Sequence, residues 1–96
     1  MTTIEDQGRA LLGSILGEVL AQRTAAGVAK YGQTLDQNHQ PDRAKAVHLV
    51  QEELDAMQYA LWLGNSRKAA RHATEAEITV ALYGLTVTEI MTGGKQ

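Results

Sequence analysis

The chain has 96 residues, a formal charge of −2 at pH 7 and 44% hydrophobic residues, with one proline, no phenylalanine and no cysteine. The lack of cysteine excludes thiol catalysis, zinc thiolate sites and disulfides, the interspersed charges argue against a nucleic-acid polymer as partner, and no apolar run approaches the ~20 residues that span a bilayer. We therefore expect a single all-α domain in the cytoplasm, with no membrane partner, that assembles as a dimer or tetramer because so short a chain buries a modest core.

The first predicted helix covers residues 3–30. Its apolar residues follow the i, i+3, i+4 spacing of an amphipathic helix: Ile4, Leu11, Leu12, Ile15, Leu16, Val19 and Leu20. Three glycines interrupt this stripe: Gly8, Gly13 and Gly17. Each costs up to ~1 kcal/mol relative to alanine inside a helix, which indicates close approach of another helix or of a ligand. Lys30 and Gly32 are typical of a helix end.

The second predicted helix covers residues 42–63 and follows a polar loop, residues 32–41. Pro41 and Asp42 suit the first turn and the cap of a helix. Two helices joined by a short loop form an antiparallel hairpin, so we expect the first and second helices to pack against each other.

The C-terminal segment, residues 66–91, allows two interpretations. Residues 66–72 are a candidate for a short helix. Thr74 and Glu77 have the spacing of a capping box, which predicts a helix from about residue 75 to residue 91. The β-branched residues on both sides of Gly84 favour a β-hairpin instead. We expect the helix.

Acidic residues interrupt the second helix, which otherwise has the composition of a buried one. Glu52 and Asp55 are three positions apart, so their carboxylates lie side by side on a helix. Acids are seldom buried unless they are paired or bind a metal, and Mg²⁺ is commonly held by one or two carboxylates together with phosphates of a substrate. The pair therefore indicates a divalent-cation site. The alternative is that Glu52, Glu53 and Asp55 lie on a solvent face without a function.

The predicted hairpin brings a third carboxylate to this pair. If the first helix ends near Lys30 and the second begins near Arg43, antiparallel packing places Glu18 near Asp55 and Gln22 near Glu52. Three converging carboxylates raise each other's pKa unless a cation neutralises them, so Mg²⁺ or Mn²⁺ is expected between the helices.

The residues around the acidic pair are candidates for contacts with a substrate. His48 and Tyr59 share its helix face. His48 is a ligand, an orienting hydrogen-bond partner or a surface residue, and Tyr59 either stacks on a base or closes the core. Lys30 either contacts phosphates or compensates for the helix dipole, and Tyr31 either stacks on a base or packs under the loop. With Gln22 they form the predicted substrate-binding set.

Two segments together resemble a known family. Lys30-Tyr31-Gly32-x-x-Leu35, followed by a polar loop and Glu52-Glu53-Leu54-Asp55-Ala56-x-x-Tyr59, is similar to the short phage-type members of the MazG-like, all-α nucleotide pyrophosphohydrolases. The resemblance covers residues 18–63. It implies a helical core built by two or more chains that hydrolyses nucleoside triphosphates to monophosphate and pyrophosphate. Some phage relatives act on dGTP or dATP, which implies a purine dNTP as substrate and the host cytoplasm as location.

The resemblance also implies roles for the acids. In the family, an E-E-x-x-E set on the first helix and an E-x-x-D pair on the second hold Mg²⁺ or Mn²⁺. The pair carries over to Glu52 and Asp55, whereas Glu18 alone matches the first set, because Val19 and Gln22 stand where acids are expected. Glu53 could supply the missing charge. A water molecule, assisted by Glu18 or Glu52, would attack the α-phosphorus and release pyrophosphate.

Two other hypotheses are consistent with the same residues. The incomplete first acidic set fits a non-catalytic helical oligomer that binds or sequesters a nucleotide. A third possibility is a small helical interaction protein that assembles through its apolar stripes while its acids face solvent.

Overall fold

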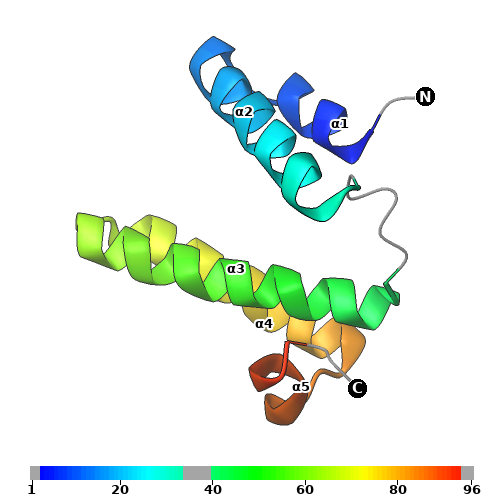
Figure 1. The fold of residues 1–96 in the computed structure, drawn as a ribbon. Coiled ribbons are helices and arrows are strands. Elements are labelled where there is room, and N and C mark those ends of the chain that lie inside the picture. The colour runs from blue at the N-terminus through cyan, green and yellow to red at the C-terminus, as the bar shows by residue number, and fades with distance from the viewer. Residues whose placement is uncertain (1–2, 34–39, 94–96) are drawn as a thin grey trace. The chain divides into compact units, whose positions relative to one another are not determined.

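The computed structural model describes residues 3–33 and 40–93, which are helical with short connections (Figure 1). The helices are α1 (Ile4–Ala10), α2 (Ser14–Tyr31), α3 (Asp42–Leu63), α4 (Ser66–Tyr83) and α5 (Val87–Met91). The chain divides into two compact units, residues 1–39 and residues 40–96. The predicted all-α class is confirmed for the described residues. None of their helices is long and apolar enough to cross a membrane.

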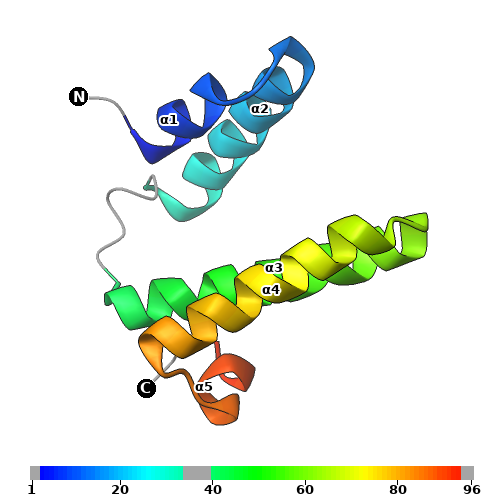
Figure 2. The ribbon, with the colours of Figure 1, turned by 180° about the vertical axis from the view of Figure 1, so that it is seen from behind.

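The first unit contains two helices where the sequence predicted one. The single helix predicted for residues 3–30 is wrong at Leu11–Gly13, where α1 ends and Gly13, in an extended conformation, precedes α2. Thr3 and Asp6 form a capping box at the start of α1. The break lets α1 fold back beside α2, as both views show (Figures 1 and 2).

Close approach, predicted from the glycines, is found at one of the three. A Cβ atom on Gly8 would lie 3.2 Å from Cδ2 of Leu20, so the missing side chain allows α1 to approach α2. A Cβ atom at Gly13 or Gly17 would meet nothing within 4 Å. Gly13 is explained by its place at the break between the helices.

The second unit is built on an antiparallel hairpin of α3 and α4 (Figure 2). The bounds of α3 coincide with those predicted for the second helix. Gly64 ends α3 at φ 87°, a left-handed conformation that glycine adopts without strain. The Asn65 side chain then accepts a hydrogen bond of 3.0 Å from the Lys68 backbone N–H and caps α4. The core contains alanines and valines of α3 and α4, which allow the helices to approach closely, and Leu85 from the connection after α4. The buried alanines and valines are Ala46, Val47, Val50, Ala60, Ala69 and Ala76.

The C-terminal segment is helical, as expected, but its boundaries differ from the prediction. α4 begins at Ser66, so Thr74 lies inside the helix and does not cap it. The Thr74 hydroxyl instead donates to the carbonyl of Ala70, at 3.0 Å. Gly84, at φ 58°, ends α4, and the β-hairpin alternative is wrong. Burial of Ala76 and Leu85 against α3 outweighs the β propensity of this segment.

Arg43 joins the start of α3 to the end of α4 and to α5. Its guanidinium donates to the carbonyls of Tyr83, at 2.5 Å, and Gly84, at 2.8 Å. It also forms a two-point ion pair with Glu89, in which Nη2 lies 2.7 Å from Oε1 and Nε donates to Oε2. Glu89 completes a capping box with Thr86 at the start of α5. The hydrogen bonds from Arg43, followed by those from Thr86, lower the pKa of Glu89 to about 2.

Packing of the first predicted helix against the second would be a contact between the two units. It stays a prediction. The antiparallel hairpin that the structure describes is that of α3 and α4. Within the predicted loop, residues 34–39 lie outside the described residues.

Candidate functional site

The acidic pair lies on the face of α3 that points away from α4. Glu52 and Asp55 are both exposed, while Val47, Val50 and Ala60 on other sides of the helix are buried. The helix is continuous through this stretch, so the two carboxylates are neighbours, as predicted. Their exposure within the second unit removes the argument that burial demands a cation. The chemistry of the donors still fits a cation. Two neighbouring carboxylates with open surroundings suit a Mg²⁺ or Mn²⁺ ion that keeps water or phosphate oxygens as further ligands.

Glu53, beside the pair in sequence, faces α4 and is already bound. Its Oε2 lies 2.6 Å from Nδ1 of His72, and both side chains are partly buried, at 21% and 25% exposure. The contact links α3 to α4 across the hairpin. Glu53 thus has a structural partner, His72, that was not among the predicted site residues. Locating His72 required knowing that α4 begins at Ser66, since only then does its antiparallel register with α3 follow.

His48 and Tyr59 share the exposed face of α3 with the acidic pair. Both are exposed within the second unit, and Tyr59, at 67%, takes no part in the core between α3 and α4. The centroid of the Tyr59 ring lies 6.4 Å from that of Trp62, with 39° between the ring planes. Trp62, at 85% exposure, was not among the predicted site residues. Its spacing of three residues from Tyr59 was the signal that could have identified it.

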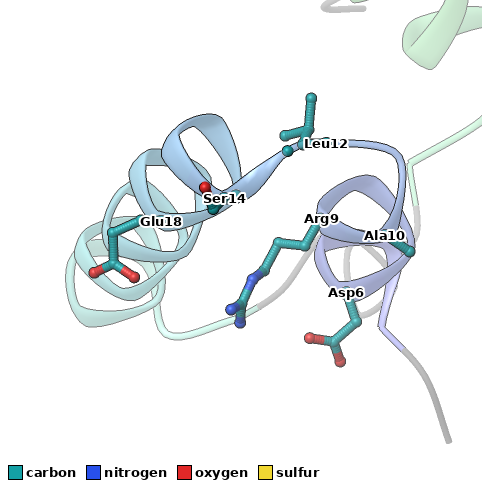
Figure 3. Close-up of a pocket in the computed structure, with 8 residues that line it drawn as sticks. Asp6, Arg9, Ala10, Leu12, Ser14 and Glu18 are labelled. Carbon is teal, nitrogen blue, oxygen red and sulfur yellow. The ribbon is translucent and has the colours of Figure 1, made fainter.

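Glu18 lies in the first unit, beside an open pocket of about 420 Å³ between α1 and α2. The pocket is lined by Asp6, Arg9, Ala10, Leu12, Gly13, Ser14, Gly17 and Glu18. Figure 3 shows the Arg9 guanidinium between the carboxylates of Asp6 and Glu18 in this view. Charges of both signs therefore line the pocket, two carboxylates and one guanidinium. This pocket could not be predicted from the sequence, because it depends on the break between α1 and α2.

The other predicted residues of the first unit lie on α2. The Gln22 side-chain amide donates to Glu18 Oε1 at 3.1 Å, which holds the Glu18 carboxylate from one turn away. Lys30 lies in the last turn of α2, where a cation stabilises the helix dipole. Tyr31 ends the helix, and its side chain lies outside the part that the structure describes.

The predicted set of carboxylates draws on both units. Within residues 3–33 and 40–93, no group of three or more histidines, aspartates or glutamates is arranged to hold a metal ion. The convergence of Glu18 with Glu52 and Asp55 depends on how the units pack, and it stays a prediction.

No family model, no curated protein and no solved structure matches this chain. The assignment of function therefore rests on the motifs and on the geometry of α3.

Proposed function

We propose that the protein is a metal-dependent nucleotide pyrophosphohydrolase of the MazG-like type. Its substrate would be a (deoxy)nucleoside triphosphate, with purine dNTPs as the first class to test. The observation that carries the proposal is the exposed face of α3, on which Glu52 and Asp55 are adjacent and Tyr59 follows one turn later. The lysine-tyrosine-glycine segment at residues 30–32 adds to it.

Each acid has a proposed part in the reaction. Glu52 and Asp55 would hold Mg²⁺ or Mn²⁺, which supplies neutralisation of the charge on the triphosphate. Glu18 or Glu52 would accept a proton from the water molecule whose oxygen attacks the α-phosphorus. The bond between the α-phosphorus and the bridging oxygen then breaks, and pyrophosphate leaves with that oxygen. Lys30, Gln22 and His48 are proposed to contact the phosphates.

Assembly into a homodimer or homotetramer is part of this proposal. Several apolar side chains of α2 and of the connection just before it are exposed in the structure: Leu12, Ile15, Leu16 and Val19. Ile15 is 79% exposed, and contiguous apolar surface of this kind marks an interface. Covering it by the second unit of the same chain or by another copy would supply the core that α1 and α2 lack. Light scattering coupled to size-exclusion chromatography measures the number of copies.

The test is hydrolysis of each common (d)NTP with Mg²⁺ or Mn²⁺, with chromatographic identification of monophosphate and pyrophosphate. Glu52→Gln and Asp55→Asn should lower kcat/KM by about 100-fold or more, because several kcal/mol of charge stabilisation are lost. Glu77→Gln, on an exposed position of α4, is the matched control and should leave turnover unchanged. Circular dichroism checks that each variant is folded. Unchanged turnover in both α3 variants would reject this site.

A nucleotide-binding protein without turnover is the second candidate. Gln22, at a position where the resemblance implies an acid, donates its amide to Glu18, and Glu53 is bound by His72. These contacts occupy oxygen atoms of both carboxylates that a catalytic metal would otherwise use as ligands. Nucleotide binding measured by calorimetry, without products under Mg²⁺ or Mn²⁺, would favour this candidate over the enzyme.

A further inference from the structure

We propose that Trp62 contacts the nucleobase of the substrate and, with Tyr59, forms an aromatic platform at the outer end of the site. This inference rests on the proposed function, since it uses the same face of α3. It extends the site beyond the motif, which ends at Tyr59. It also restricts the substrate class to nucleotides.

Trp62 lies on the same side of α3 as the acidic pair. Seven residues separate Asp55 from Trp62, which is close to two helical turns, so both side chains leave the helix on the same side. The rise of an α-helix puts them about 10 Å apart along the axis. A phosphate group held near Asp55, with the nucleoside directed toward the C-terminal end of α3, would place the sugar beside Tyr59 and the base beside Trp62.

The indole ring of Trp62 is exposed to solvent. Trp62 is 85% exposed, so its indole surface is available to a ligand. The angle of 39° between its ring and that of Tyr59 shows that the two do not stack on each other in parallel. Exposed aromatic rings bind bases by stacking, and they tolerate different bases because each has a π-face. The platform therefore favours nucleotides over inorganic polyphosphates and discriminates weakly among bases.

The fluorescence of the protein provides a direct test, because Trp62 is the single tryptophan. The full chain is titrated with dGTP, dTTP and inorganic tripolyphosphate, with Ca²⁺ in place of Mg²⁺ to limit turnover. We expect both nucleotides to quench the emission of Trp62 and tripolyphosphate to leave it unchanged. An equal response to all three, or an emission that is blue-shifted and insensitive to them, would overturn the inference. The blue-shifted case would show that Trp62 is packed between copies.

Steady-state kinetics provides the second measurement. Trp62→Ala should raise KM for a dNTP about tenfold, as expected for the loss of one stacking contact, with little change in kcat, and Trp62→Phe should restore most of the affinity. Leu63→Ala is the control, because Leu63 is the neighbouring residue and is also exposed, at 79%.

The outcomes separate the platform from the proposed function. Turnover without quenching, or with an unchanged KM in Trp62→Ala, rejects the platform and leaves the enzyme assignment. Quenching without turnover supports the platform and favours the binding protein. Absence of both quenching and turnover rejects both proposals.

Discussion

The two units of the molecule differ in how much of their apolar surface they bury. In the second unit, α3 and α4 enclose Val47 and Val50, which are 0% and 2% exposed. In the first unit, none of the side chains that the structure describes, those of residues 3–30, 32 and 33, is buried. The candidate residues divide in the same way, since Glu18, Gln22 and Lys30 lie on α2 and the acidic pair lies on α3.

This difference indicates that the hairpin of α3 and α4 stabilises itself, whereas α1 and α2 depend on a further contact. α1 has 7 residues, which is below the length at which an isolated helix persists in water. A catalytic set that includes Glu18 would form only when the apolar face of α2 is covered. Activity and packing of the first unit should then vary together.

The largest effect is expected from a charge in the core of the second unit. Val50→Asp buries an unpaired carboxylate and should destabilise the protein by several kcal/mol, enough to unfold it. Circular dichroism during thermal unfolding measures the loss. Val19→Asp, on the partly exposed face of α2, is the matched change in the first unit and should leave the melting of α3 and α4 in place. Similar losses in both variants would contradict the difference between the units.

Hydrogen exchange should show the same difference without a mutation. Protection increases with the free energy of local opening, so backbone amides in the middle of α3 should exchange at least ~100-fold more slowly than those in the middle of α2. Mass spectrometry of peptides from each helix measures the rates. Equal protection would mean that the first unit is held as firmly as the second. Addition of Mg²⁺ with a nucleotide should increase protection in α2 if the site spans both units.

A smaller effect is expected from the contact between Glu53 and His72. His72→Ala removes a partly buried hydrogen bond to a charged group and should lower the free energy of unfolding by about 1 kcal/mol. Arg71→Ala, one residue earlier and exposed, is the control and should have little effect. Denaturant unfolding measures both.

Turnover of the same variants tests the role of Glu53. If this residue is structural, Glu53→Gln should change stability and leave the dependence of turnover on metal concentration unaltered. A large rise in the Mg²⁺ concentration required for activity would instead identify Glu53 as a metal ligand.

The smallest effect is expected from the ion pair of Arg43 and Glu89, and it depends on pH. Since the folded-state pKa of Glu89 is lowered to about 2 from an ordinary value of 4.5, its stabilising contribution is complete above about pH 4.5. The contribution is lost as the pH falls toward 2. Melting curves of the parent protein and of Glu89→Gln should differ above pH 4.5 and converge toward pH 2. A difference that is constant over this range would contradict the assignment.

Much of the second unit could be predicted from the sequence. The bounds of α3 follow from Pro41 and Asp42 at its start and Gly64 at its end, and these are local signals. The shared face of His48, Glu52, Asp55 and Tyr59 follows from helical periodicity alone. A functional face on one uninterrupted helix is readable because its geometry requires no knowledge of neighbouring elements.

The sequence by itself determined the all-α class, the extent of α3 and the column of side chains that includes the acidic pair, because these depend on contacts within one or two helical turns. Tertiary structure decided the break at residues 11–13, the continuity of α4 from Ser66 to Tyr83 and the partners of Glu53 and Arg43. These features join residues distant in the chain, such as Arg43 and Glu89. These features form only where packing buries enough apolar surface. The buried area depends on the whole fold, so local helix or strand propensity cannot predict it.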